Sequence, residues 1–196
     1  LVAAGLLRPS WGHWELDVVR AGDIPLADSA VDLVARRIEG LSPDTRRLLG
    51  VAAVLGTTFS TDLVAQVSST DLQRVLQAVA EASWTHLLEP QTDGEHAFSH
   101  DCVREALLAQ FTEGERRRLH QRIADDLEGS TAGCPYAVFA AAWHTRHGET
   151  AHNQAQLFRT HRAAGILALR EHAPERAVEY LRQAVDAGST GEPVPD

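Results

Sequence analysis

The residues best suited to chemistry stand together in the stretch AFSHDCVREALL, residues 97–108, where the pattern predicts a strand that leads into a helix. A histidine at a helix start, such as His100, can donate a ring N–H to an anion beside the free backbone amides. Asp101 follows it directly. A purely structural interpretation is also open: Ser99 as the N-cap, Asp101 as a first-turn partner of the helix dipole, and His100 as a surface or packed side chain.

Two other groups of residues could hold a ligand. The basic run at 116–118, with Arg122 one turn further on, could contact a phosphate or a partner domain, although such runs are usually solvated helix faces. His144, His147 and His152 lie closer to the C-terminus. Because no carboxylate or cysteine completes a set at ligand spacing, we interpret them as surface or packing residues and predict no metal site.

Signatures of catalysis are missing from the sequence. It contains no G-x-x-x-x-G-K-[ST] phosphate loop, no G-x-S-x-G motif and no Cys–His pair with a supporting motif. Without a phosphate loop and a magnesium-binding acid, the chain cannot hydrolyse ATP by itself. We therefore predict a regulatory role, with no catalytic residue and no cofactor of its own.

Composition and charge restrict the class of protein. A hydrophobic content of 44% in 196 residues is typical of a globular protein, and no run approaches the roughly 18 apolar residues of a membrane span. The net charge of −9 argues against broad affinity for nucleic acid. We expect a cytoplasmic protein with Cys102 and Cys134 as free thiols. Because methionine is absent, we also expect an excised piece whose natural start lies upstream of Leu1.

Periodicity and turn signals predict mostly short helices in the first half of the chain. Residues 1–17 predict a helix end and two short strands around a turn at 9–12. An amphipathic helix is predicted over 27–41. The best-defined helix spans 42–56, because a serine can cap it, a proline suits its first position and a glycine can end it.

A helix-turn-helix with a small wing is predicted next. Helices over 60–69 and 69–83 are joined by a tight turn. The segments 85–90 and 96–99 then flank the turn QTDGE, whose Asp-Gly pair is a hairpin signal. The residues of the second helix that should face inward are Leu72, Val75, Leu76 and Val79.

The remainder of the chain returns to helical spacing. Helices are predicted over 101–111 and 112–128, the second with Thr112 and Glu115 in capping-box register. The stretch 130–135, STAGCP, is small and turn-prone and predicts a linker.

Three further helices are predicted at 136–148, 150–172 and 174–188. In them small residues alternate with large ones, as close packing between antiparallel helices requires. The pattern resembles a tetratricopeptide-type array, of which roughly one and a half repeats fit here. The small residues are Ala163, Ala164, Ala168, Ala177 and Ala184, and the large ones are Leu157, Phe158, Leu169, Tyr180 and Leu181.

The stretches LSPDTRRLLGVAAVLG and FSHDCVREAL, and the order of the predicted elements, resemble the STAND class of signal-transduction ATPases. More narrowly, the chain is similar to the large bacterial LuxR-type transcriptional regulators, over roughly residues 24–187. In that family an AAA/NB-ARC-like ATPase domain precedes a winged helix and a tetratricopeptide-like sensor, often followed by a DNA-binding helix-turn-helix. The resemblance implies a bacterial protein of signal transduction and transcription regulation.

The resemblance also implies a role for the opening motif. In the wider class, a Met-His-Asp motif of the winged helix uses its histidine to touch the β-phosphate of bound ADP and so holds the closed, inactive form. His100 and Asp101 stand at the matching positions and would bind the nucleotide phosphate of the ATPase domain, with ATP or ADP as the cofactor of the parent protein. Phe98 and Ser99 depart from the usual pattern.

We therefore expect a mainly α fold, in which a winged helix with a small β-hairpin wing precedes an antiparallel tetratricopeptide-like array. Residues 1–23 would end the ATPase lid and form a connecting hairpin, 24–129 would form the winged-helix domain with its following helices, 136–188 the tetratricopeptide-like helices, and 189–196 a linker. The expected partners are the upstream ATPase domain of the same chain and an inducer or regulatory protein on the helical repeats. No membrane contact is expected, and DNA would bind another domain of the parent.

Three alternatives from other classes stay open. The chain could be the regulatory arm of a multidomain kinase or nucleotide cyclase, or a helical adaptor that binds protein alone. It could also be a DNA-binding winged helix, with 71–83 in the major groove. The composition of that helix opposes this alternative, since Arg74 and two glutamines stand against Asp71 and Glu81.

Overall fold

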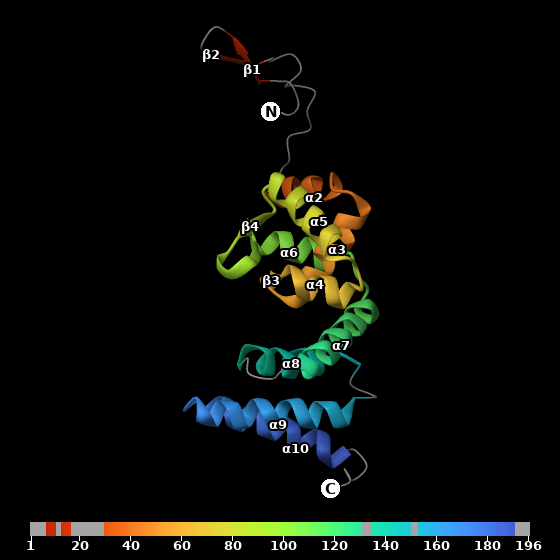
Figure 1. Ribbon diagram of the computed structural model, residues 1–196, viewed down its shortest axis with the longest axis vertical. Helices are drawn as coiled ribbons and strands as arrows, with labels where there is room; N and C mark the ends of the chain where they lie inside the picture. Colours follow the sequence, from red (N-terminus) through yellow and green to blue (C-terminus); the bar gives the residue numbers. More distant parts are fainter. Residues whose placement is uncertain (1–6, 11–12, 17–29, 131–134, 150–152, 191–196) are drawn as a thin grey trace.

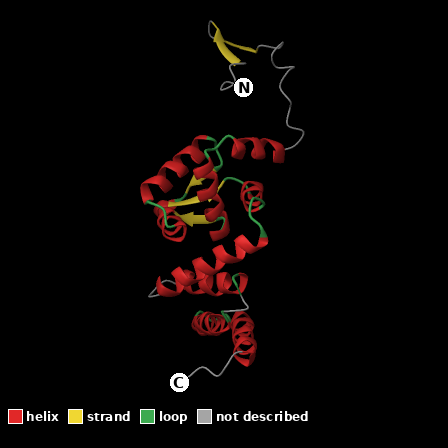
Figure 2. Cartoon of the chain, turned by 90° about the vertical axis from the view of Figure 1, so that its right-hand side faces the viewer, coloured by secondary structure: helices red, strands yellow, loops and turns green. Residues whose placement is uncertain are grey.

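The computed structural model describes residues 7–10, 13–16, 30–130, 135–149 and 153–190, and over these residues the chain is mainly helical (Figure 1). The strands form two small antiparallel sheets (Figure 2). The predicted mainly α class is confirmed at this level, while the winged-helix and tetratricopeptide-like assignments stay predictions. None of the helices in these ranges combines the length and the apolar character that crossing a membrane requires.

A short hairpin lies near the N-terminus. Strand β1 (Leu7–Ser10) pairs antiparallel with β2 (His13–Leu16), with Leu7 opposite Leu16. This pairing confirms the two strands that the sequence predicts here. The helix end predicted before them lies outside the described residues.

The larger sheet has three antiparallel strands. Strand β5 (Glu95–Phe98) lies between β3 (Thr58–Ser60) and β4 (Leu88–Pro90). The turn between β4 and β5 is the 3-10 helix η1 (Thr92–Gly94), and Gly94 has a φ of 76°, in the left-handed region that favours glycine. The hairpin predicted from the Asp-Gly signal is therefore confirmed. The helices packed around this sheet are α2 (Ala30–Glu39), α3 (Pro43–Leu55), α4 (Thr61–Ser68), α5 (Leu72–Trp84) and α6 (Asp101–Leu108).

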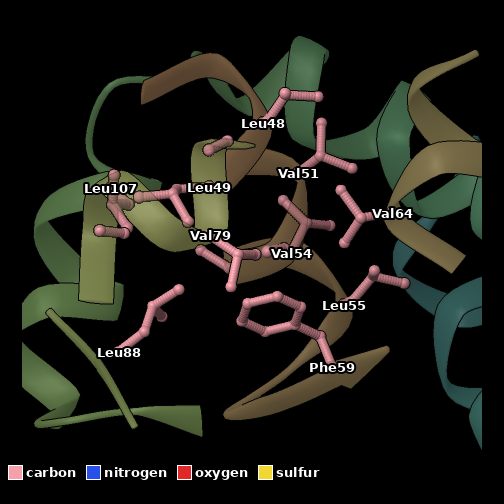
Figure 3. Packing of buried hydrophobic residues seen from close by; sticks show 14 of the residues in the cluster. Leu48, Leu49, Val51, Val54, Leu55, Phe59, Val64, Val79, Leu88 and Leu107 are labelled. Carbon is pink, nitrogen blue, oxygen red and sulfur yellow. The ribbon is translucent and has the colours of Figure 1, made fainter. Parts of the chain in front are cut away.

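Helix α3 is the central helix of this part, because every residue from Leu48 to Leu55 is buried (Figure 3). Its ends follow the prediction. The Ser42 hydroxyl accepts a hydrogen bond from the backbone N–H of Thr45 at 3.2 Å, Pro43 occupies the first turn, and Gly56 ends the helix.

The carboxylate of Glu81 in α5 holds the start of α3. It accepts hydrogen bonds from the Ser42 backbone N–H at 2.8 Å, from the Ser42 hydroxyl at 3.0 Å and from the Thr45 hydroxyl at 2.5 Å. These hydrogen bonds lower the pKa of Glu81, and the bond from Thr45 has the largest effect. A charged carboxylate at this position is also favoured by the dipole of α3.

The inward face of α5 differs from the prediction. Val75 and Val79 are buried as predicted, but Leu72 and Leu76 are 40% and 48% exposed. The prediction for these two leucines is wrong because α5 carries two overlapping apolar stripes of helical spacing. The stripe that turns inward includes small alanines, which allow α5 to approach α3 closely. Its members are Val75, Ala78, Val79 and Ala82.

The rest of the described chain consists of four long helices. Helix α7 (Glu113–Ser130) packs against α3 and α4 and also against α8 (Pro135–His147). Helix α8 in turn packs on α9 (Gln154–Arg170), and α9 on α10 (Pro174–Thr190) (Figure 1). The predicted capping box of α7 is confirmed, since Thr112 and Glu115 exchange hydrogen bonds at its start. The linker predicted at 130–135 falls mainly outside the described residues.

Small residues allow α9 and α10 to lie close together. A Cβ atom on Gly165 would stand 2.6 Å from Cγ of Leu181. Four of the five alanines predicted at helix contacts are buried: Ala164, Ala168, Ala177 and Ala184. The fifth alanine, Ala163, is exposed, and so is Leu169, one of the large residues predicted at these contacts. Both face solvent because the contact stripe of α9 follows 160, 161, 164, 165 and 168 instead.

One hydrophobic cluster joins the sheet-containing part to the long helices. Ile123 and Leu127 of α7 and Ala137 and Ala141 of α8 belong to the same buried cluster as the side chains of α3. Helix α7 therefore contributes buried side chains to a core that it shares with both α3 and α8. The predicted domain boundary between residues 129 and 136 stays a prediction, because this shared cluster does not test it.

The contact between Gly50 and Phe111 gives a test of this packing. A Cβ atom on Gly50 would lie 2.5 Å from two ring carbons of Phe111. We expect Gly50→Ala to lower the free energy of unfolding by about 1–3 kcal/mol, the usual cost of overpacking a core. Urea unfolding followed by circular dichroism measures this change.

Gly114→Ala is the matched control, because no atom lies within 4 Å of the Cβ position at the exposed start of α7. Alanine should leave stability unchanged there or raise it by up to about 1 kcal/mol through its better helix propensity. Equal effects of the two substitutions would contradict the close packing at Gly50.

Candidate functional site

The start of α6 is held firmly on α3 and on the larger sheet. Val103 and Leu107 of α6 are buried, and Nε of Arg104 donates a hydrogen bond of 2.8 Å to the carbonyl oxygen of Ala53. Immediately before the helix, the Ser99 backbone N–H donates to the carbonyl oxygen of Leu87 at 3.0 Å. These contacts fix the backbone on both sides of His100 and Asp101.

The side chains of His100 and Asp101 are exposed. His100 occupies the N-cap position with φ −150° and ψ 149°, and its side chain makes no capping hydrogen bond. Asp101 is the first helical residue. Neither side chain forms a hydrogen bond or an ion pair with any residue that the structure describes. Both are therefore available to a ligand or domain outside the described chain.

The interpretation of Ser99 as the N-cap is wrong. Its hydroxyl oxygen is buried and has no hydrogen-bond partner among the described residues, while the cap position belongs to His100. The backbone bond from Ser99 to Leu87 keeps this residue in the extended chain that leaves β5. The first amides of α6, which have no acceptor within the helix, thus lack a side-chain cap from Ser99 or His100.

A second group of polar side chains lies where α3, α7 and α8 meet. Nδ1 of His120 in α7 stands 2.9 Å from Nδ1 of His144 in α8. The backbone of Leu55, in the last turn of α3, interacts with His144 and raises its pKa, but burial outweighs this effect. His147 lies beside them, with its ring centroid 5.5 Å from that of His120. We call these three histidines the histidine joint.

The contact between His120 and His144 needs one proton. One Nδ1 must carry a hydrogen and donate it while the other accepts it. When both rings are neutral, either histidine can be the donor.

Burial makes both members of this pair weak bases. It lowers the pKa of His144 to about 3 and that of His120 to about 4, and the nearby positive charges of other basic side chains add to the effect. Both rings are neutral at neutral pH. The part of the chain that the structure describes contains no group of three or more His, Cys, Asp or Glu residues placed to hold a metal ion, and His152 lies outside it.

Of the two roles that the sequence left open for His144, surface or packing, the structure shows packing, since His144 is buried. His120 was not predicted as its partner. The two positions lie at nearly equal distances along the chain from the connection between α7 and α8. In an antiparallel helix pair, such positions face each other. That symmetry was the available signal.

A polar network extends from α7 to α9 beside the joint. The side-chain oxygen of Gln121 accepts a hydrogen bond of 2.6 Å from the buried Asn153, and its Nε2 donates to the buried Gln156 at 2.7 Å. Nε2 of Gln156 donates to Asp125 at 2.9 Å and to Glu128 at 3.0 Å. The buried amide N–H groups find acceptors in this network, while the side-chain oxygen of Asn153 is buried and has no partner among the described residues. The network fixes the register of α7 against α9.

No protein-family model, curated protein or solved structure matches this chain. The function is therefore argued from its own residues and their geometry.

The histidine joint predicts a loss of stability in mild acid. Because the folded pKa values of about 4 and about 3 lie below the ordinary 6.5, the unfolded chain binds more protons as the pH falls below about 6.5. The free energy of unfolding should therefore decrease from pH 6.5 toward pH 4. We expect His144→Gln to reduce this slope by about 1.4 kcal/mol per pH unit between pH 6 and 5. Urea unfolding at a series of pH values measures it.

His86→Asn serves as the control, since His86 is exposed and lies outside the joint. Its slope should equal that of the unaltered protein. A slope for His144→Gln as steep as that of the unaltered protein would contradict a neutral, buried His144.

Proposed function

We propose that this chain is a regulatory arm of a STAND-type, ATP-dependent transcriptional regulator of the LuxR kind. It would couple the nucleotide state of an ATPase domain to a helical-repeat sensor. The observation that carries the proposal is the position of His100, which is exposed, held by a fixed backbone and free of partners among the described residues. An imidazole at a helix start suits a phosphate oxygen, because the helix amides and dipole favour an anion there.

The arrangement of the elements supports the winged-helix part of the proposal. Helices α4 and α5 are separated by a turn in which Ser69 adopts the left-handed conformation with φ 51°. The β4–β5 hairpin follows, and β3 completes the sheet. Helices α9 and α10, in close contact at Gly165, would begin the tetratricopeptide-like sensor.

In the proposed mechanism His100 acts as one side of a clamp. With ADP bound, His100 contacts the phosphate and holds the winged helix against the ATPase domain, with Asp101 orienting the imidazole. A ligand on the helical repeats that binds the open form better shifts the population toward exchange for ATP. The chain itself performs no bond chemistry.

The outer face of α5 supports DNA contact less well. Its exposed residues include Leu72 and Leu76, and Arg74 is its one basic side chain. A recognition helix needs several donors and cations for phosphates and base edges. DNA would bind the parent protein through another domain.

The test compares His100→Asn with His86→Asn in the full-length parent protein. Asparagine is a good N-cap, so His100→Asn removes the imidazole without weakening the start of α6. We expect the purified His100→Asn protein to retain at least tenfold less ADP and to show raised basal transcription. Nucleotide extracted from the purified protein is measured by chromatography.

His86→Asn removes another exposed histidine of the same part of the chain, at a position with φ 56° that asparagine tolerates. It should retain ADP like the unaltered protein. Unchanged ADP content and basal activity in His100→Asn would refute the role of His100.

A further inference from the structure

The basic run of α7 lines a depression that the proposed function does not use. The depression has a volume of about 420 Å³ and lies between the first turns of α7 and the last turn of α8. This volume falls within the range of about 300–1,000 Å³ that is typical of small-molecule sites. The residues around it are Glu113, Arg116, Arg117, His120, Arg146, His147 and Gly148.

The charges of this depression are unbalanced. Arg117 forms an ion pair with Glu113, the carboxylate among the lining residues. Arg116 and Arg146 come from different helices, are exposed, and form no ion pair with any residue in the described ranges. Two uncompensated guanidinium groups therefore face one small volume in a chain whose net charge is −9.

His120, which lines the depression, is affected by the same positive charges. Burial is the main cause that lowers the pKa of His120 to about 4, but the charges of His147, Arg104 and Arg116 lower it further. A bound anion would reverse the sign of this local field. His120 would then take up a proton more readily.

We propose that this depression binds the phosphate group of a small phosphorylated molecule, with Arg116 and Arg146 as its main ligands and His120 and His147 beside them. Guanidinium groups suit this chemistry because they offer paired N–H donors that match two phosphate oxygens. The site does not include His100 and does not rest on the proposed nucleotide contact.

The negative charge of the surrounding protein surface favours a small phosphorylated ligand over a long polyanion. A nucleic acid would extend from the depression across a protein surface with an excess of carboxylates, and repulsion would offset the local attraction. A single phosphate interacts mainly with the two arginines, because charges beyond about 10 Å are screened at moderate salt.

The position of the site also suggests what it regulates. His120 belongs both to the depression and to the histidine joint, so a bound phosphate acts directly on the contact between α7 and α8. The ligand would thereby stabilise the arrangement of these two helices.

The test uses the 196-residue chain, with inorganic phosphate and pyrophosphate as probes, at constant ionic strength. Proton NMR follows the imidazole C–H signal of His120 across the pH range, and calorimetry measures affinity. We expect phosphate to raise the pKa of His120 by about one unit, as an anion at a few ångströms does. Pyrophosphate should bind more tightly than phosphate.

The double substitution Arg116→Gln and Arg146→Gln should weaken pyrophosphate binding at least tenfold and abolish the shift at His120. The matched control is Arg162→Gln with Arg170→Gln, two exposed arginines on α9 that carry the same charge change. It should change the affinity less than twofold. An unchanged far-ultraviolet circular dichroism spectrum without probe shows that both variants are folded.

Three results would overturn the proposal. The first is a pKa of His120 that does not change at saturating pyrophosphate. The second is an equal loss of pyrophosphate affinity in both double variants, because it would show that binding depends only on the overall charge of the protein. The third is a single-stranded oligonucleotide that binds through Arg116 and Arg146 while phosphate and pyrophosphate do not. That result would assign the arginines to a nucleic acid instead.

Discussion

The carbonyl groups in the last turn of α3 are the constraint on which the arrangement of the chain depends. The last four carbonyl groups of a helix receive no hydrogen bond from an N–H of the same helix. When such a carbonyl is buried, leaving it without a donor costs free energy. Ala53 and Leu55 are both buried. The carbonyl oxygen of Ala53 accepts a hydrogen bond from Arg104 of α6, and the backbone of Leu55 interacts with His144 of α8. One helix end thus holds two elements that are far apart in the sequence.

The opposite end of α3 is held just as firmly by Glu81, so α3 has little freedom to move relative to α5. Leaving one of these buried groups unpaired costs about 1–3 kcal/mol. A displacement of α6 relative to α3 must break the hydrogen bond from Arg104 to Ala53, and a displacement of α8 must separate His144 from the backbone of Leu55. Both α6, which begins next to His100, and α8, which lines the depression, thus contact the same end of α3.

The sequence predicts the parts of this arrangement that depend on local rules. The cap of α3, the Asp-Gly hairpin and the capping box of α7 were predictable because each is set by residues a few positions apart. The inward face of α5 was not, since two stripes of equal helical spacing compete and only the packing against α3 selects between them. The position of His100 at a helix start was also predictable, but the free state of its side chain was not, because it depends on which residues fold back onto it. The same reason explains why the Nδ1 contact of His120 with His144 was missed.

The histidine joint can hold one extra proton but not two. When one ring is charged, its Nδ1–H donates to the neutral Nδ1 of the other ring, so the contact at 2.9 Å is kept. When both rings are charged, two N–H groups would stand against each other and the contact would break. An anion beside Arg116 favours the first proton, on the His120 ring that lines the depression, whereas acid charges both rings in turn. The joint can thus be strengthened by a ligand and broken by acid, although both act by adding a proton.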